Sequence, residues 1–252
     1  MKTPALSLAI AISSALALTA CGGGGSSGGS TAQPSTPVVK PNPTNPTNPA
    51  KVQISGESLV VNTKADTDGK FINTNTDNIN TLNVDGKTFN IGSPNIIFGS
   101  FGDINNAQLH TTISGTHMKY AKYGFVRDKN AQMEYYFYQG EKTPVANVPT
   151  TGTANYKGQS IYACETCNSQ MVQGTSEFKV DFGKKTLSGS ISNAKVSNIA
   201  LNATISGNSF NGKNSAGTET RGAFFGDKAQ EISGAYVNNE KAFGGVFGAT
   251  KQ

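Results

Sequence analysis

Apolar and polar side chains alternate along much of the C-terminal half of the chain. Over residues 176–182 three apolar side chains alternate with charged ones, and the same period of two recurs over 187–191 and 199–205. This period is typical of β-strands that bury one face and expose the other. Turn-forming residues such as Gly207 and Asn208 separate these runs. The pattern predicts about eight strands, over residues 152–163, 176–182, 187–191, 199–205, 208–214, 220–226, 229–237 and 242–248.

Short antiparallel strands at regular spacing favour a closed up-and-down barrel, because closure leaves no exposed edge strand. The interior of an eight-stranded barrel is filled by side chains, and Gly189, Gly234 and Gly245 would fit its taper. A membrane-spanning barrel needs an apolar outer band. Charged residues occupy the outward positions instead: Glu177, Lys179, Asp181, Lys195 and Lys228. No long window shows apolar positions at helical spacing, so the sequence predicts an all-β chain with a water-soluble barrel.

The first 51 residues lack the alternating pattern of the C-terminal half. Residues 1–20 carry one charge, Lys2, before an apolar run that ends at Cys21 in the order Leu-Thr-Ala-Cys. This is the order of a lipoprotein signal peptide, and the run is too short to span a bilayer as a helix. We therefore expect cleavage before Cys21 and fatty acylation of Cys21, such as palmitate. The alternative is an ordinary signal peptide that leaves Cys21 as a free thiol.

Residues 21–51 are rich in glycine and serine and then in proline. Such a segment cannot bury a core, so it predicts a disordered linker that lifts the folded part away from a membrane. Without Lys2, 20 basic residues face 16 acidic ones, a net charge of +4 (20 − 16), and no basic run is present. We expect no nucleic-acid binding. The chain also lacks a Ser-His-acid order, a carboxylate pair or a phosphate-binding glycine loop, so no enzyme activity is expected.

Cys164 and Cys167 form a Cys-x-x-Cys motif. A haem-attachment motif requires histidine next, where Asn168 stands, a thioredoxin-like site requires a βαβ context, and a zinc site would lack two further ligands. A disulfide between Cys164 and Cys167 remains, closing a small loop between the first two barrel strands in an oxidising exterior.

The segments 180–189, 207–212, 221–234 and 244–249 resemble the β-barrel domain of the transferrin-binding protein B family. The resemblance implies a surface lipoprotein of the Gram-negative outer membrane, with a β-rich handle over residues 52–148 and an eight-stranded barrel over 149–252. Full receptors of this type carry two such lobes, whereas this chain has one. That difference favours the single-lobed relatives, which capture haemoglobin or haem, or bind factor H.

Two handle segments, 115–126 and 135–140, and the segment 148–158 where the barrel begins are similar to the haemoglobin- and haem-binding branch. This similarity implies host haemoglobin or haem as the partner in iron acquisition, with a TonB-dependent outer-membrane transporter as the recipient. Factor H and transferrin are the alternative partners. No resident cofactor is predicted, and haem is a candidate ligand.

Aromatic residues gather in the handle, with seven between Tyr120 and Tyr138. Such side chains anchor protein interfaces but also build cores. Strand alternation would place Tyr123 and Phe125 on one face and Met118 and Tyr120 on the other. The candidate partner- or haem-binding aromatics are Tyr120, Tyr123, Tyr136, Tyr138, Phe98 and Phe101.

His110 and His117 are the two histidines of the chain. If Ser114 and Gly115 form a two-residue hairpin turn, Thr112 pairs with His117, and the two imidazoles share a face diagonally, about 7–8 Å apart. That arrangement cannot clamp one haem iron from both sides. Either His117 or His110 alone could serve as the axial ligand, and a packing role is the alternative.

Overall fold

The computed structural model describes residues 53–65, 68–92, 101–164, 167 and 171–252. These residues are β-structure apart from turns, loops, the short 3₁₀ helix η1 (Val145–Asn147) and Cys167, which is also in 3₁₀ conformation. Cys21, the linker and Phe98 lie outside the described residues. Within the described ranges, no helix combines the length and the apolar character that crossing a bilayer requires.

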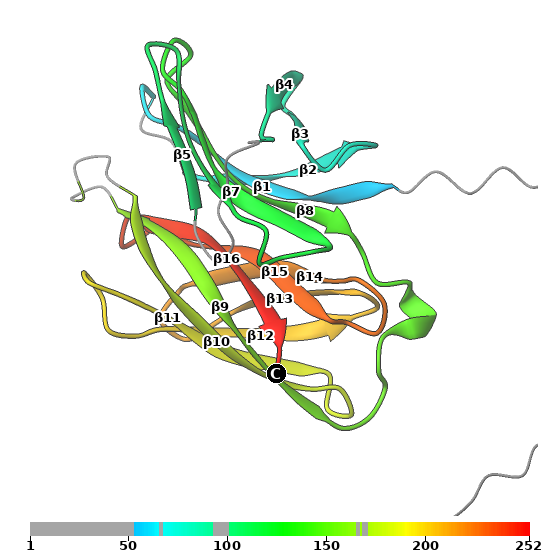
Figure 1. Ribbon diagram of the computed structural model, residues 1–252. Coiled ribbons are helices and arrows are strands. Elements are labelled where there is room, and N and C mark those ends of the chain that lie inside the picture. Colours follow the sequence, from blue (N-terminus) through cyan, green and yellow to red (C-terminus); the bar gives the residue numbers. More distant parts are fainter. Residues whose placement is uncertain (1–52, 66–67, 93–100, 165–166, 168–170) are drawn as a thin grey trace, which may run out of the picture. The chain divides into compact units, whose positions relative to one another are not determined.

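The C-terminal strands form a closed antiparallel barrel of eight strands (Figure 1). Strand β16 closes it by pairing with β9, so that Val246 lies opposite Ile161. The predicted fold class is confirmed. Strand β10 begins earlier than predicted, because Val172 pairs with Tyr162 of β9 although its neighbours do not alternate. The barrel strands are β9 (Thr153–Cys164), β10 (Val172–Asp181), β11 (Thr186–Asn193), β12 (Ile199–Ser206), β13 (Ser209–Lys213), β14 (Glu219–Phe225), β15 (Glu231–Asn238) and β16 (Phe243–Lys251).

Aromatic rings fill the barrel interior. The rings of Phe178 and Phe247 lie 4.5 Å apart, and Phe210 and Phe224 are buried beside them. A Cβ atom on Gly189 would lie 2.2 Å from Cδ1 of Phe178, so the glycine leaves room for the ring, as the predicted taper requires. The charged residues predicted to point outward are exposed or half-buried.

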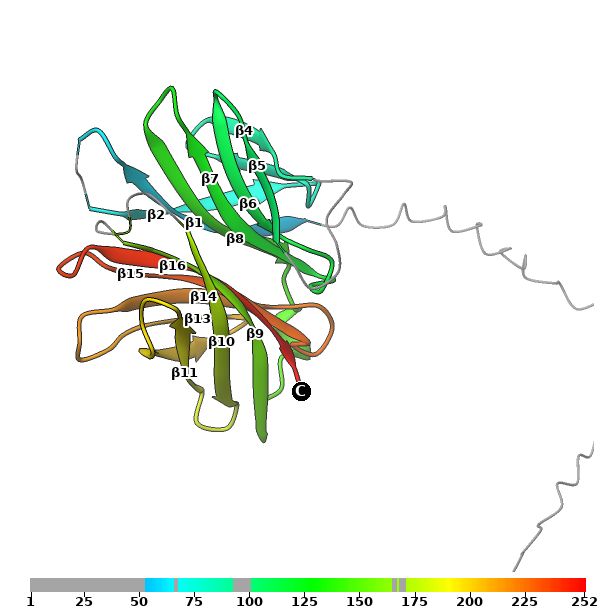
Figure 2. The same ribbon diagram turned by 60° about the vertical axis from the view of Figure 1, so that its left-hand side comes forward.

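The residues before the barrel form the handle, which consists of a six-stranded sheet and a separate two-stranded one. The order in the larger sheet is β2-β1-β8-β7-β6-β5. Figure 2 shows its strands side by side, next to the barrel strands β15 and β16. The handle strands are β1 (Ile54–Asn62), β2 (Lys70–Thr76), β3 (Thr81–Val84), β4 (Lys87–Asn90), β5 (Phe101–Asn105), β6 (Leu109–Ser114), β7 (Ala121–Asp128) and β8 (Met133–Glu141).

Both faces of the handle sheet are covered. On one face Tyr135 and Phe137 of β8 pack with Leu82 and Phe89 of the β3–β4 hairpin. On the other face the neighbouring tyrosines of β8 pack against barrel residues such as Val246. Alternate side chains of a strand point to opposite faces, so two-sided burial explains the unbroken aromatic run over residues 135–138.

Candidate functional site between handle and barrel

Tyr123 of β7 lies at the junction of handle and barrel. Its side chain is fully buried, and its hydroxyl donates a hydrogen bond of 3.1 Å to the backbone carbonyl of Gln159 in β9. A Cβ atom on Gly248 would lie 2.2 Å from Cε1 of Tyr123. The ring therefore rests directly on the backbone of β16, which only glycine allows at this distance.

A second link joins the barrel to the β6–β7 loop (residues 115–120). The carboxylate of Glu231, at the start of β15, accepts hydrogen bonds from the backbone N–H groups of Lys119, Tyr120 and Ala121 at 2.6, 3.0 and 3.0 Å. Burial raises the pKa of this carboxyl above its ordinary value, and the three N–H donors counteract part of that shift. The buried carboxylate thus fixes the loop to the barrel.

We expect Glu231→Gln to destabilise the protein by about 2 kcal/mol, the scale of hydrogen bonds to a charged group. The amide NH₂ of glutamine would face backbone N–H groups that now donate to the carboxylate, and two donors cannot form a hydrogen bond with each other. Chemical denaturation measures the change. Glu177→Gln is the control, because Glu177 is exposed and its carboxylate accepts a hydrogen bond from the exposed Lys157 side chain. Equal stability of the two variants would contradict a role for the three donors.

A third link is ionic. Tyr138 donates a 2.6 Å hydrogen bond to Glu57 of β1, whose other oxygen lies 3.5 Å from Arg221 of β14. The Arg221 guanidinium also lies over the Phe71 ring, 4.5 Å from its centroid. Burial raises the pKa of Tyr138, so its hydroxyl stays protonated and keeps donating. Handle and barrel are therefore joined through apolar, polar and charged contacts.

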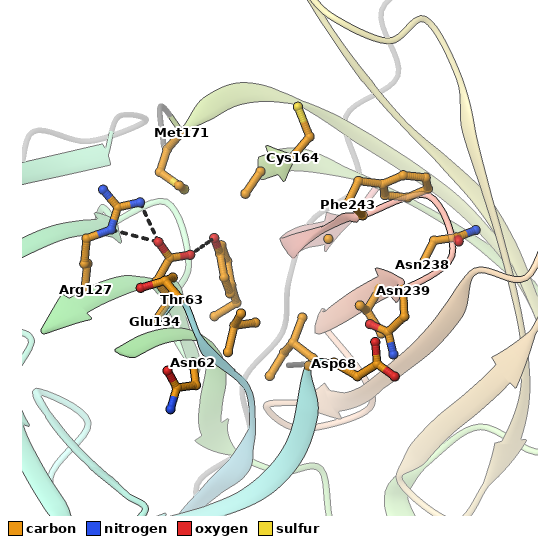
Figure 3. A pocket seen from close by; sticks show the side chains of 18 residues that line it. Asn62, Thr63, Asp68, Arg127, Glu134, Cys164, Met171, Asn238, Asn239 and Phe243 are labelled. Carbon is orange, nitrogen blue, oxygen red and sulfur yellow. Dashed lines mark hydrogen bonds and ion pairs between the residues drawn. The ribbon is translucent and has the colours of Figure 1, made fainter. Parts of the chain in front are cut away.

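A cavity of about 320 Å³ lies between the two parts, at the end where β1, β7, β9 and β15 finish (Figure 3). Its walls combine apolar side chains with a polar rim, and both handle and barrel contribute. The lining residues are Leu59, Val61, Asn62, Thr63, Asp68, Gly69, Arg127, Glu134, Tyr136, Ala163, Cys164, Met171, Val237, Asn238, Asn239, Ala242, Phe243 and Gly244.

One wall of the cavity carries a buried ion pair. Arg127 donates from Nε and Nη2 to one oxygen of Glu134, at 2.8 and 2.5 Å. The hydroxyl of Tyr136 donates to the other oxygen at 2.6 Å. Both carboxylate oxygens thereby accept hydrogen bonds, and the charge of the carboxylate is balanced by the guanidinium. Figure 3 shows this group on the opposite side of the cavity from Asp68 and Asn239.

The predicted turn at Ser114 and Gly115 is wrong. Thr112 pairs with Phe125 instead of His117, and residues 115–120 form a loop. The hydrogen bonds from this loop to Glu231 hold it open, which local turn preferences could not reveal. His117, Met118 and Tyr120 therefore lie in a loop rather than on strand faces, and the two histidines do not share a face.

His117 lies against Phe101 and Tyr123, both in edge-on ring contact. Its Nε2 is 3.3 Å from the Tyr123 hydroxyl, and that hydroxyl donates its hydrogen bond to the backbone carbonyl of Gln159. Nε2–H is then the donor, and Nδ1 carries the lone pair. Nδ1 is buried and has no hydrogen-bond partner among the described residues.

We expect the stability of the protein to fall as the pH drops below 6.5, in part through His117. Burial lowers the pKa of His117 below its ordinary value, so the unfolded chain takes up the proton first. The stability that this histidine contributes is complete above its unfolded pKa and is lost as the pH falls through the folded one. The melting temperature of His117→Gln should therefore decline less between pH 7.5 and 5.5 than that of the wild type. Equal declines would contradict the prediction.

His110 is placed elsewhere, on β6. Its Nε2 lies 3.1 Å from Asp103, and its ring meets the Phe125 ring edge-on at 5.7 Å. Within the described residues no group of three or more histidine, cysteine, aspartate or glutamate side chains could hold a metal ion.

The predicted aromatic site residues are mostly interior. Tyr123, Tyr136 and Tyr138 are between 0 and 4% exposed, so they offer a partner almost no surface. Tyr120 and Phe101 are half-buried, and Phe101 packs on Tyr123. The tyrosines are interior because the sheet that carries them is covered on both faces.

The predicted disulfide between Cys164 and Cys167 is confirmed. Cys164 also lines the cavity, together with Met171 from the following strand connection. The sequence did not reveal this cavity, because its lining residues come from separate segments that fold together. The buried Arg127–Glu134 pair was missed as well, although two opposite charges inside an aromatic-rich stretch are a usable signal.

A family model described as the C-lobe and N-lobe β-barrels of transferrin-binding protein B matches residues 148–251. An uncharacterized protein of Haemophilus influenzae is 35% identical over 202 residues, which cover 71% of this chain and 68% of that protein. Transferrin-binding protein B of Haemophilus influenzae is 29% identical over 164 residues. That match covers 50% of this chain and only 26% of the relative, so the chain spans a minor part of its length.

Two solved structures have the same fold. Transferrin-binding protein B of Neisseria meningitidis superposes with a TM-score of 0.62 at 21% identity, over 79% of this chain and 43% of that one. HpuA of Kingella denitrificans, solved in complex with human haemoglobin, superposes with a TM-score of 0.52 at 14% identity, over 82% of this chain and 89% of that one. The chain belongs to the transferrin-binding protein B-like family, and its described residues form one handle and one barrel.

Proposed function

We propose that this chain is a surface-exposed outer-membrane lipoprotein that captures a host iron-carrying protein, with haemoglobin or its haem preferred. Lipid on Cys21 would anchor it, and the linker up to residue 51 would hold the folded part away from the membrane. A TonB-dependent transporter would receive the haem or iron.

The share of each solved structure that this chain covers supports haemoglobin over transferrin as the partner. The chain corresponds to nearly all of the protein that was solved with haemoglobin, but to less than half of the transferrin-binding one. One handle and one barrel, as the described residues form them, would therefore be sufficient for capture. The fold contributes a rigid junction, because the links through Tyr123, Glu231 and Arg221 hold the handle and barrel surfaces in a fixed arrangement.

The buried tyrosines stabilise the junction between handle and barrel. We therefore place the partner contacts on strand β5 and on the β6–β7 loop. Ile104, at 48% exposure, is an exposed large apolar side chain on this edge strand. Phe101 of the same strand and Tyr120 of the β6–β7 loop are half-buried. Apolar anchors of this kind carry much of the binding energy of protein interfaces.

Capture is tested by immobilising residues 21–252 and offering haemoglobin, iron-loaded transferrin and factor H separately. We expect binding of haemoglobin, weakened about tenfold in Ile104→Ser. Val145→Ser is the control, because Val145 is also exposed, at 62%, but lies in the connection between handle and barrel. Binding of transferrin alone would overturn the preference for haemoglobin, and binding of factor H alone would overturn iron acquisition.

Direct haem binding is tested separately by titrating the protein with haemin and recording the Soret band. Nδ1 of His117 has a free lone pair but is buried, so ligation requires the β6–β7 loop to move. If His117 ligates haem, His117→Ala abolishes the sharpened band and His110→Ala preserves it. Haemoglobin capture without any spectral change would show docking without haem transfer.

A further inference from the structure

We infer that the cavity between handle and barrel binds an alkyl chain that ends in a cationic group, such as a primary alkylammonium. Binding of an alkylammonium in this cavity does not require the proposed capture of an iron-carrying protein, although one of the two sources of the cationic group does. The inference rests on the apolar walls of the cavity, on its charge balance and on its size.

The walls offer apolar surface that the fold leaves partly uncovered. Val61, Ala163 and Met171 pack against the buried cluster at the junction but remain only half-buried. Together with Leu59 and Phe243 they line the cavity. An alkyl chain placed here would remove these side chains from water, which is the main favourable term for apolar ligands.

The charges of the lining residues do not cancel. Arg127 and Glu134 neutralise each other across a 2.5 Å ion pair, and Tyr136 occupies the other carboxylate oxygen. Asp68 is exposed at the cavity and has no hydrogen-bond or ion-pair partner among the described residues. The lining therefore carries one uncompensated negative charge, which attracts a cationic group and repels an anionic one.

The carboxylate and the apolar walls are suitably arranged for one amphiphilic ligand. Figure 3 shows Asp68 beside Asn239 at one side of the cavity, with Met171 toward the other. An amide carbonyl next to a carboxylate gives an ammonium group two acceptors. The volume of about 320 Å³ is near the lower limit for small-molecule pockets, which fits one unbranched chain.

Two sources present this chemistry. One is a free alkylamine, and the other is a lysine side chain of a bound protein, whose methylene stem and ammonium head divide between apolar and polar surroundings in the same way. The second source requires the proposed capture function, and the first does not.

The probe for the site is n-hexylammonium, with n-hexanol and hexanoate of equal chain length as comparisons. Binding is measured by NMR titration of the isotope-labelled protein. We expect hexylammonium to bind more tightly than hexanol, hexanoate to bind weakest, and Asp68→Asn to weaken hexylammonium about tenfold. Because Asp68 is exposed and has no hydrogen-bond or ion-pair partner in the described part of the chain, we expect this substitution to leave the fold unchanged. Equal affinity for hexanoate, or an unchanged Kd in Asp68→Asn, would overturn the inference.

A cavity-filling substitution gives a second, independent test. Ala163→Leu adds apolar volume to the lining and should abolish hexylammonium binding. Ala200→Leu is the matched control, since Ala200 is exposed on barrel strand β12. Unchanged binding in a folded Ala163→Leu protein would contradict a site in this cavity.

The same variants identify the source of the cationic group. If Asp68→Asn and Ala163→Leu both weaken capture of the host protein about tenfold, a lysine side chain of that protein occupies the cavity. If capture is unchanged while hexylammonium binding is lost, the ligand is a free amine. Failure of the wild type to capture any host protein bears on the proposed function alone, because the hexylammonium titration needs no host protein.

Discussion

Replacing Tyr123 with alanine should lower the stability of the protein by about 3–5 kcal/mol, the range observed for removing a large buried aromatic side chain. The ring is fully buried and is held by Gln159 and by the backbone of β16 at Gly248. In a domain of this size the loss corresponds to a decrease in melting temperature of roughly 10 °C. Because the ring joins handle and barrel, limited proteolysis should also cut the handle faster than the barrel.

Tyr123→Phe is the matched control. It keeps the ring and removes only the hydrogen bond to Gln159, so we expect a loss of about 1 kcal/mol. Gly248→Ala tests the same contact from the barrel, because its Cβ would lie 2.2 Å from the ring. If Tyr123→Phe and Tyr123→Ala lower the melting temperature equally, ring packing does not hold the junction.

Replacing Arg127 with methionine should also cost about 3–5 kcal/mol, because it leaves the Glu134 carboxylate buried without a counter-charge. The side chain of Glu134 is 9% exposed, and the Arg127 guanidinium donates two hydrogen bonds to one of its carboxylate oxygens. The double variant Arg127→Met, Glu134→Gln should recover much of the loss, since it removes the unpaired charge. Denaturation with urea measures the free energy of unfolding of the single and the double variant.

The exposed pair Lys157–Glu177 provides the control for this prediction. Its side chains are 58% and 62% exposed, so Lys157→Met should change stability by less than about 1 kcal/mol. If Arg127→Met has an effect as small as Lys157→Met, burial does not make the Arg127–Glu134 pair important. No recovery in the double variant would indicate that the arginine stabilises the fold through packing on Phe125 instead.

The sequence predicted the barrel well because several of its strands, such as β10 and β12, carry a local signal. The alternation of Phe178, Val180 and Phe182 with charged neighbours needs no knowledge of the rest of the chain. Glycines such as Gly189 were also interpreted correctly, since a position opposite a large ring requires a small residue. In these strands the local pattern and the tertiary environment agree.

The candidate site was predicted less well because its geometry depends on contacts between distant segments. The loop around His117 is set by Glu231, more than a hundred positions further along the chain. The tyrosines of β8 have the residue types of an interface, yet the surface that they cover belongs to the same chain. Aromatic content alone cannot distinguish an internal interface from an external one.

Strand β16 has a consequence for how the chain is made. It closes the barrel against β9 and also contacts the ring of Tyr123. The barrel surface that packs against the handle is therefore complete only after residues Phe243–Lys251 have joined the fold. A nascent chain that lacks them holds an open sheet edge and an uncovered aromatic surface, both of which invite aggregation. We therefore expect the nascent chain to need protection from aggregation until strand β16 has been synthesised.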